Sequence, residues 1–306
     1  MELKVVVTGG AGFIGATLAQ ALLIQGEEVV VVDNLSAGAA SRVPTEAHFI
    51  KADVRDPDVL KRAFVGVDTI FHQAAVGSIP RSLADPLVVH DSNATGTLNV
   101  LLAAEHVGCP RVVYASSSSV YGESNRPIKR EDDPTKPISP YGVSKLAGEL
   151  YCRVWDRLRR VETVSLRYFN VFGPNQRQEG PYSAVFPSFI SALAAGRQPV
   201  VYGDGNQTRD FTFVDDVVRA NIAAARVDLK EGNEAIFNIG GGSPKSVNDV
   251  LTSVVTAMSV GIDPVFMPAR SGDVRHSSAD ISRATSLLHW KPLVPWEEAV
   301  GRTCLA

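Results

Sequence analysis

The first 33 residues constrain the fold more than any other part of the chain. A β-branched run at 3–8 ends at a glycine turn, an Ala- and Leu-rich segment follows at 16–25, and a second β-branched run at 28–32 ends at Asp33. Short apolar runs of this kind are typical of strands that are buried on both faces. The segment between them has the composition of a helix. The sequence therefore predicts a strand, helix, strand unit at the N-terminus.

The alternation of strands and helices continues to about residue 172. We expect further strands at 48–50, 69–72, 112–115 and 163–167, and helices at 57–64, 93–106 and 141–158. Such alternation is typical of an α/β fold with a doubly wound, mainly parallel sheet of the Rossmann type.

The second half of the chain has a different character. Loops rich in Gly, Pro, Asn and Gln separate shorter elements, which we expect as helices at 186–195, 215–226 and 247–258 and a strand at 235–239. We therefore predict a Rossmann domain over residues 1–172, with sheet elements returning from about 208–242. Residues 173–306 are expected to form a smaller, interleaved substrate-binding lobe without an independent core.

Charge and cysteine content exclude several classes of protein. The 306 residues include 33 acidic and 30 basic side chains, which gives a net charge of −3. This charge excludes a general nucleic-acid-binding surface, which would need a strong excess of basic residues. A few arginines could still bind one small phosphorylated ligand. The three cysteines lack metal-type spacing, so we expect neither a disulfide framework nor a metal site, and we predict a reducing, cytoplasmic location. We also expect no signal peptide and no membrane span.

A glycine motif follows the first predicted strand. Gly9, Gly12 and Gly15 have the spacing G-x-x-G-x-x-G. On its own such a triplet also fits a structural turn, but a turn that opens a helix can bring its backbone N–H groups against a diphosphate. Asp33 ends the next strand, where a carboxylate can bind both hydroxyls of an adenosine ribose and would repel a 2′-phosphate. The sequence therefore predicts NAD as the cofactor and not NADP. Asp53, with Val54, follows the third strand and could contact the adenine, or it could be an ordinary loop residue.

Hydroxyl groups and a lysine form a second pattern. Tyr141 and Lys145 are four residues apart and would share one face of a helix. A lysine ammonium stabilises a phenolate and so lowers the pKa of the tyrosine, which otherwise lies near 10. The serine run 116–119 follows a strand and could supply a further hydroxyl. Each feature alone also fits a surface pair or a polar turn, whereas their combination behind a glycine motif favours a catalytic site.

These motifs make the chain resemble the extended short-chain dehydrogenase/reductases of the nucleotide-sugar epimerase/dehydratase family. The segments that carry the resemblance cover nearly the whole chain: Thr8–Gly15, His72–Ala75, Ser116–Gly122, Tyr141–Lys145, Arg167–Asn170, Gly203–Gly205, Arg209–Phe211 and Gly272–His276. Within the family, His72–Pro86 and Gly272–Ile281 are most similar to bacterial UDP-N-acetylglucosamine and UDP-glucose 4-epimerases.

The resemblance implies a role for each matching residue. Tyr141 would be the catalytic base, Lys145 its electrostatic partner and a ribose ligand, and Ser117 the hydroxyl near the sugar O4. The implied NAD-binding residues are Gly9, Gly12, Phe13, Ile14, Gly15, Asp33, Asn34, Asp53, Val54, Gln73, Ala74, Ala75, Asn93, Ser116, Tyr141, Lys145 and Tyr168.

The resemblance also implies which residues bind the substrate. Arg209, Arg270 and Asn170 match residues that bind the diphosphate of a UDP-sugar, although each could be an ordinary surface or turn residue. Ser277 matches a residue that closes the sugar pocket, and its small side chain would admit an N-acetyl group. The other implied substrate contacts are Gly77, Ser78, Ser117, Ser118, Tyr182, Val185, Tyr202 and Asp273.

Three reactions share this scaffold in the family. A 4,6-dehydratase would need an Asp-Glu pair where this chain has Ser118 and Ser119, and a net reductase would favour NADP, against Asp33. The sequence therefore predicts reversible C4 epimerisation of UDP-GlcNAc/UDP-GalNAc, and also of UDP-Glc/UDP-Gal, by transient hydride transfer to tightly bound NAD⁺ through a 4-keto sugar. A UDP-glucuronate 4-epimerase or decarboxylase, and a non-catalytic NAD-binding regulator, remain alternatives. By resemblance, the helices at 93–106 and 141–158 would pair in a homodimer.

Overall fold

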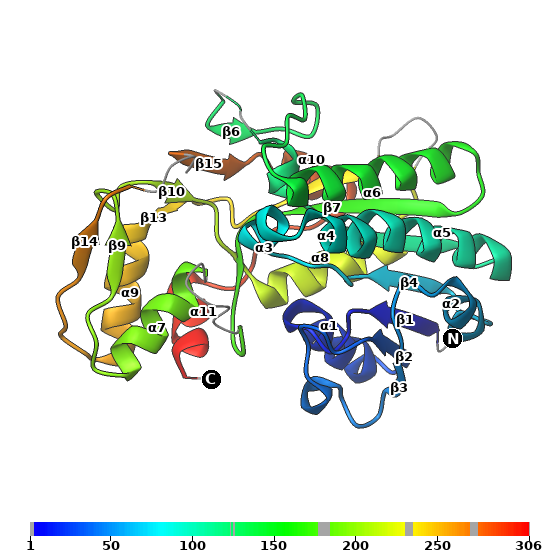
Figure 1. Cartoon of the computed structure of the whole chain (residues 1–306), viewed down its shortest axis with the longest axis horizontal. Coiled ribbons are helices and arrows are strands. Elements are labelled where there is room, and N and C mark those ends of the chain that lie inside the picture. Colours follow the sequence, from blue (N-terminus) through cyan, green and yellow to red (C-terminus); the bar gives the residue numbers. More distant parts are fainter. Residues whose placement is uncertain are drawn as a thin grey trace.

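The computed structural model describes residues 3–122, 124, 126–176, 184–229, 235–269 and 275–305. Its centre is a sheet of seven parallel strands in the order β12-β7-β5-β4-β1-β2-β3 (Figure 1). The bounds of these strands are β1 (Lys4–Thr8), β2 (Glu28–Asp33), β3 (His48–Lys51), β4 (Thr69–His72), β5 (Arg111–Ser117), β7 (Glu162–Tyr168) and β12 (Ile236–Ile239). The direction in which strands are added reverses at β1 and β4, which is where ligands bind in folds of this class.

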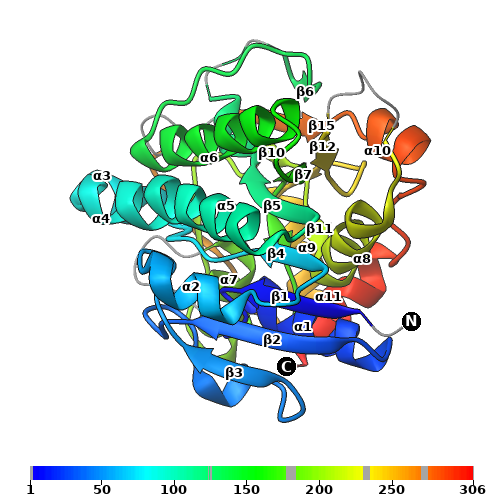
Figure 2. The same ribbon diagram turned by 90° about the vertical axis from the view of Figure 1, so that its right-hand side faces the viewer.

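Helices cover both faces of this sheet (Figure 2). One face packs against α2 (Pro57–Ala63), α5 (Gly96–Val107) and α6 (Pro140–Arg157), and the other against α1 (Phe13–Ile24) and α8 (Val214–Arg226). Successive side chains of a strand point to opposite faces, so Val6 and Val30 join the first layer and Val5 and Val31 join the second. The prediction of a doubly wound α/β fold is confirmed.

Short helical segments precede α5. The chain runs through α3 (Ile79–Ala84), α4 (Pro86–His90) and the π-helical turn η2 (Asp91–Thr95) before α5 begins. The helix predicted at 93–106 therefore starts inside a longer, irregular helical run. Two 3₁₀ turns, η1 (Ala40–Arg42) and η3 (Ser118–Val120), follow β2 and β5.

The second lobe packs around a hydrophobic cluster that Phe13 and Ile14 of α1 also join. The expectation that this lobe has no independent core stays a prediction. The helices of the lobe are α7 (Val185–Ala194), α9 (Val247–Met258) and α11 (Trp296–Cys304), and its outer strands are β9 (Val200–Tyr202) and β14 (Val265–Met267). Between them Phe172, Phe186, Phe211 and Trp296 pack together, with the rings of Phe172 and Phe186 stacked at 4.2 Å between centroids. The aromatic residues come from separate elements and loops, so no periodic pattern in the sequence indicates this cluster.

Short strands connect the two parts of the molecule. A four-stranded sheet has the order β13 (Lys245–Ser246), β10 (Thr208–Arg209), β15 (His276–Ala279), β6 (Ile128–Lys129), and a separate pair joins β8 (Val171–Phe172) to β11 (Thr212–Phe213). The last described helices of the chain are α10 (Ser282–Leu287) and α11, and α10 lies against β12. Among the described residues, no helix is long and apolar enough to cross a membrane.

Candidate active site

A cavity of about 930 Å³ lies at the carboxyl ends of the central strands. It extends from the glycine turn after β1 to Arg209 on β10 and Ser277 on β15, which are paired in register. The cavity is lined by these residues of the predicted site: Gly9, Gly12, Phe13, Ile14, Gly15, Asp33, Asn34, Asp53, Val54, Gln73, Ala74, Ala75, Gly77, Ser78, Ser116, Ser117, Ser118, Tyr141, Lys145, Tyr168, Asn170, Arg209 and Ser277.

The glycine turn fits a dinucleotide diphosphate. Gly9 has φ +72°, and a Cβ on Gly15 would lie 2.2 Å from the carbonyl oxygen of Gly9, so this tight turn excludes a side chain at either position. No side chain among the described residues caps α1, whose N-cap is Gly12. The first N–H groups and the positive end of the helix dipole therefore face the cavity, where they can bind an anion.

Two acidic residues line the cavity at the ends of β2 and β3. The Asp33 carboxylate accepts hydrogen bonds from the N–H groups of Ala11 (3.0 Å) and Leu35 (2.7 Å), which leaves acceptor capacity for a ribose hydroxyl. Asp53 accepts from Asn34 and from the Arg55 guanidinium, and the bond with Arg55 holds the pKa of Asp53 well below its usual value. Both carboxylates are therefore fixed in position before a ligand binds.

Hydrogen bonds also fix the cavity wall beyond β4. Gln73 Nε2 donates to the Tyr168 hydroxyl (3.1 Å) and to the side-chain oxygen of Asn221 (2.9 Å). Asn93 does not line the cavity; it exchanges hydrogen bonds with the backbone of Val76 and so supports the wall from behind. Asn221 was not predicted, because its only signal is a polar residue in the middle of α8.

Ser117, Tyr141 and Lys145 meet at one wall of the cavity. Ser139 caps α6 by accepting a hydrogen bond from the N–H of Gly142 (3.1 Å), which places Tyr141 in the first helical turn. Lys145 follows one turn later, with its Nζ donating to the carbonyl oxygen of Ala115 (2.8 Å). Ser117 ends β5, and its hydroxyl contacts the Ser119 hydroxyl at 2.7 Å. It also lies close enough to the Tyr141 phenol to lower the pKa of that phenol.

Burial changes the acidity of both titratable members of this group. Burial raises the pKa of Tyr141, and the nearby Ser117 hydroxyl partly opposes this rise. Burial lowers the pKa of Lys145 to about 7, because an ammonium is poorly solvated there. The two pKa values therefore move apart, and burial favours the neutral form of each group. The expected lowering of the Tyr141 pKa is therefore wrong for this structure, because burial outweighs the effect of Ser117 and raises the pKa.

The predicted substrate residues divide between two cavities. Val185 and Tyr202 line a neighbouring cavity of about 330 Å³, which shares Asn170 and Arg209 with the main one. Asn170 Nδ2 donates to the carbonyl oxygen of Asp210 (3.0 Å). Tyr182, Arg270 and Asp273 lie outside the described residues.

Several cavity residues were not predicted. Arg42, Arg81 and Lys129 line the cavity and add positive charge to its wall. Behind the wall, the buried Asp210 carboxylate holds β15 by accepting a hydrogen bond from the N–H of Ala279 at 2.9 Å. Isolated arginines and lysines form no pattern in a sequence, so only the fold brings them to the cavity. The described residues contain no group of three His, Cys, Asp or Glu side chains that could hold a metal ion.

Comparisons with known proteins agree with this geometry. The model of the NAD dependent epimerase/dehydratase family matches residues 5–240. A relative from Methanocaldococcus jannaschii, named a putative UDP-glucose 4-epimerase, is 37% identical over 97% of this chain and 96% of its own length. A UDP-glucuronate 4-epimerase from Thermodesulfobacterium geofontis is 33% identical over 97% of this chain and 94% of its own length.

A solved structure is similar over nearly its whole length. It is a UDP-N-acetylglucosamine 4-epimerase from Methanobrevibacter ruminantium in complex with UDP-N-acetylmuramic acid, and it aligns with a TM-score of 0.94 and 36% identity over 99% of this chain and 97% of that one. The predictions of an NAD-dependent enzyme and of NAD as cofactor are thereby confirmed. The chain belongs to the NAD dependent epimerase/dehydratase family.

Proposed function

We propose that this chain interconverts UDP-hexoses that differ in configuration at C4. The observation that carries the proposal is the continuity of one cavity from the glycine turn to Ser117, Tyr141 and Lys145, and on to Arg209. This arrangement provides for a dinucleotide, a reacting hydroxyl and a phosphorylated substrate in a single site. The names of the relatives, which act on UDP-glucose, UDP-glucuronate or UDP-N-acetylglucosamine, support the same class of reaction.

Each residue of the site has a separate role in the proposed reaction. Bound NAD, held by the glycine turn and Asp33, supplies the reversible oxidation of the sugar at C4. Tyr141 accepts the proton of the O4 hydroxyl and later returns it, while the Ser117 hydroxyl, which lines the same wall of the cavity, orients the O4 oxygen. The positive charge of Lys145 stabilises the phenolate form that Tyr141 must have before it accepts this proton. Arg209 and Asn170 bind the diphosphate.

The residues around Ser117 favour epimerisation over elimination. Among the described residues that line the cavity, the carboxylates are Asp33 and Asp53, both at the end next to the glycine turn. Ser118 and Ser119 cannot provide the acid and base that removal of a C5 proton and a leaving hydroxyl would need. The 4-keto sugar is therefore expected to turn within the site and to be reduced on its other face.

We further propose that the sugar pocket admits an N-acetyl group. Among the described residues, no atom lies within 4 Å of a Cβ placed at Gly77, and Ser277 contributes a small side chain to the same cavity. Small residues leave room for the larger substituent without excluding UDP-glucose.

We also propose that residues 1–172, with returning sheet elements, form a cofactor domain and that residues 173–306 form a substrate lobe.

A UDP-glucuronate 4-epimerase or decarboxylase is the second candidate. The observation that favours it is the positive charge of Arg81 and Lys129 on the cavity wall, where a C6 carboxylate could be bound. The similarity to a UDP-glucuronate 4-epimerase supports the same alternative.

A substrate comparison with the base removed tests the proposal. The purified protein is incubated separately with UDP-GlcNAc, UDP-Glc and UDP-GlcA, and the products are separated by chromatography and identified by NMR. We expect the C4 epimers of the first two. Tyr141→Phe should reduce turnover at least 100-fold, about the contribution of a general base, while NAD stays bound. Turnover of UDP-GlcA alone would favour the second candidate, and conversion of none of the three would refute the proposal.

We propose that two copies of the chain associate through α5 and α6. Leu102 on α5 and Leu150, Val154 and Leu158 on α6 expose 43 to 56% of their surfaces, and the last three are spaced by four residues on one helical face. Light scattering should give twice the 32.7 kDa chain mass. The double substitution Leu150→Glu, Val154→Glu should give the monomer mass, while Leu293→Glu, at another exposed apolar site, should not. A monomeric wild type would contradict the proposal.

A further inference from the structure

The serine loop, residues 116–121, is held at both ends by one ion pair. At its start, the Ser116 hydroxyl donates to Glu149 Oε2 (2.7 Å). At its end, the Tyr121 hydroxyl accepts a hydrogen bond from Arg167 Nη1 (2.9 Å). Glu149 and Arg167 bond to each other through two contacts, Nη2 to Oε1 at 2.6 Å and Nε to Oε2 at 2.9 Å. The loop between these attachments carries Ser117.

The pair is almost completely buried. Glu149 is 2% exposed and Arg167 is 3% exposed, and the guanidinium carbon lies 4.8 Å from the centre of the Tyr121 ring. Removing two charges from water costs free energy that their attraction often fails to recover, so such a pair is weak evidence for a stabilising role. Its bidentate geometry instead fixes the directions of both side chains. A role in positioning the loop accounts for this arrangement.

The pair connects the loop to the helix that carries the other reacting groups. Glu149 lies two turns beyond Tyr141 and one turn beyond Lys145 on α6, so the three side chains share one helical face. Because Ser116 hydrogen-bonds to Glu149, the position of the loop is set relative to the helix that holds the phenol.

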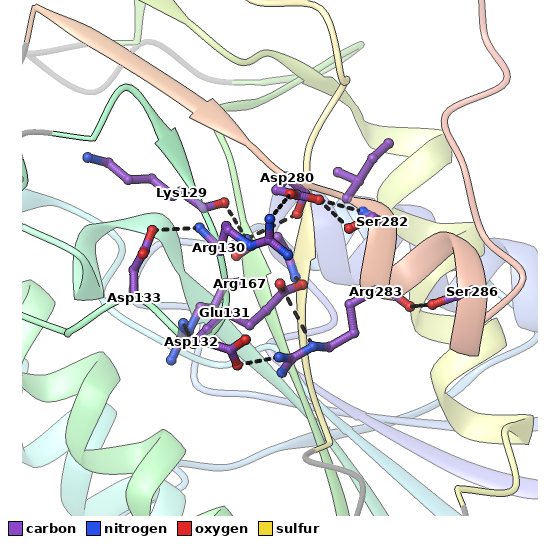
Figure 3. A network of polar contacts seen from close by, with 12 residues as sticks. Lys129, Arg130, Glu131, Asp132, Asp133, Arg167, Asp280, Ser282, Arg283 and Ser286 are labelled. Carbon is purple, nitrogen blue, oxygen red and sulfur yellow. Dashed lines mark hydrogen bonds and ion pairs between the residues drawn. The ribbon is translucent and has the colours of Figure 1, made fainter.

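A second set of contacts holds Arg167 and Tyr121 from the opposite side. The Tyr121 hydroxyl donates to Asn238 Oδ1 (2.6 Å), and the N–H of Asn238 donates to Glu131 Oε1 (2.8 Å). Arg167 Nη1 also donates to the carbonyl oxygen of Glu131 (3.1 Å). Figure 3 shows Arg167 among the side chains of segment 129–133, with Asp280 and Arg283 beside them. Arg167 is therefore fixed from several elements and cannot follow the loop if the loop moves.

We propose that Glu149 and Arg167 are positioning residues that hold the serine loop against α6, so that the Ser117 hydroxyl stays beside the Tyr141 phenol. This inference rests on the proposed function, in which Tyr141 is the base. It also gives Ser116 a role different from cofactor binding, because its hydroxyl faces Glu149 and is buried.

If the serine loop positions Ser117, loosening the loop should change the pKa of Tyr141, which a purely structural role would not do. The nearby Ser117 hydroxyl lowers the pKa of Tyr141, so a loop that loosens should raise this pKa. The titratable and charged groups around the phenol are Lys145 on α6 and Tyr114 on β5, and α3 brings Arg81 to the same cavity wall. Substitutions at Ser116 or Tyr121 change none of these three side chains. A shift in the pH dependence of turnover would therefore report on the position of the serine loop.

The test uses two small substitutions that leave the ion pair intact. Ser116→Ala removes the first attachment, Tyr121→Phe removes the second, and Ser165→Ala removes a buried hydroxyl from the neighbouring strand β7 as a matched control. In both loop variants the acidic limb of the kcat/KM profile should move to higher pH, with KM for the UDP-sugar within about twofold of wild type. Below the pKa of the base, turnover falls about tenfold for each pH unit of this shift. The control should keep the wild-type profile.

A second measurement does not depend on turnover. The phenol of Tyr141 is titrated by its ultraviolet absorbance in each protein, with the matching Tyr141→Phe variant as the blank. We expect a higher pKa in both loop variants than in wild type. If wild type epimerises no UDP-sugar, the proposed function fails, and this titration still decides the positioning role. Unchanged profiles and unchanged titrations in both loop variants, whatever their thermal stability, would overturn the inference.

Discussion

Ser277 lines the end of the cavity where we propose that the sugar binds, and its small side chain leaves that end open. It lies on β15, paired in register with Arg209 on β10, and it lines the cavity together with Gly77 and Ser117. The end of β15 is held in place, because the buried Asp210 carboxylate accepts a hydrogen bond from the N–H of Ala279 (2.9 Å). A larger side chain at position 277 is therefore expected to fill the pocket instead of moving the strand.

Ser277→Tyr should separate the two classes of substrate. The ring occupies the space that an N-acetyl group needs, so turnover of UDP-GlcNAc should fall at least 100-fold while UDP-Glc turnover stays within about fivefold, since a steric clash can discriminate by several kcal/mol. Initial rates with both substrates give the comparison. Ser277→Ala keeps the space and should retain both activities. Loss of both activities in the tyrosine variant, or of neither, would contradict the placement of Ser277.

The residues of the proposed reacting group could be selected from the sequence, whereas the residues that support them could not. Ser117, Tyr141 and Lys145 belong to short motifs in which spacing and side-chain chemistry point to one role. Glu149 belongs to no such motif, and Arg167 begins the matching segment 167–170 without a role being implied for it. A glutamate within a helix and an arginine at the end of a strand usually face solvent. They are brought together by the packing of α6 on β5 and β7, which becomes visible only in the folded chain.

At the scale of elements, strong periodicity made prediction accurate. The structure has α1 at Phe13–Ile24, β2 at Glu28–Asp33 and α9 at Val247–Met258, within a few residues of the ranges expected. Most of the strands that were not predicted, such as β8 and β10, have two residues each, and the longest of them, β15, has four. Two residues show no alternation, and these strands exist because a distant segment pairs with them.

The helices α3 and α4 were missed for a different reason. Ser78 and Asp85 cap their first turns, and each cap is followed within two residues by a proline, which is a recognisable start signal. The segments are six and five residues long, too short for an amphipathic pattern to support that signal. The caps matter for the site, because α3 brings Arg81 and Ser78 to the cavity wall.

At the scale of the whole molecule, His72 links the centre of the sheet to the helical layer. The ring, which is 1% exposed, contacts the Thr8 hydroxyl at 2.7 Å through Nδ1 and the Thr97 hydroxyl at 3.0 Å through Nε2. Thr97 donates its own proton to the carbonyl oxygen of Asn93 (2.5 Å), so Nε2 of the ring is the nitrogen that carries hydrogen. β1, β4 and α5 are thus joined through a neutral imidazole.

This neutral ring should make the stability of the protein depend on pH. Burial, with a smaller effect of Lys145, lowers the pKa of His72 to about 3, whereas an unfolded histidine has a pKa near 6.5. Below pH 6.5 the unfolded chain binds a proton that the folded chain does not, so the contribution of His72 is fully present above pH 6.5 and is lost as the pH falls toward 3. The maximum slope for one proton is about 1.4 kcal/mol per pH unit.

Urea unfolding of wild type and His72→Asn between pH 5 and 7.5 tests this expectation. The difference in unfolding free energy between the two proteins should shrink as the pH falls below 6.5, because the variant lacks the titrating ring. Comparing the two proteins cancels the opposite effect of Glu131 and Asp210, whose pKa values burial raises. The same substitution at the exposed His90 on α4 should leave the pH dependence as in wild type. A difference between wild type and His72→Asn that stays constant across this range would show that folding does not lower the pKa of the buried ring.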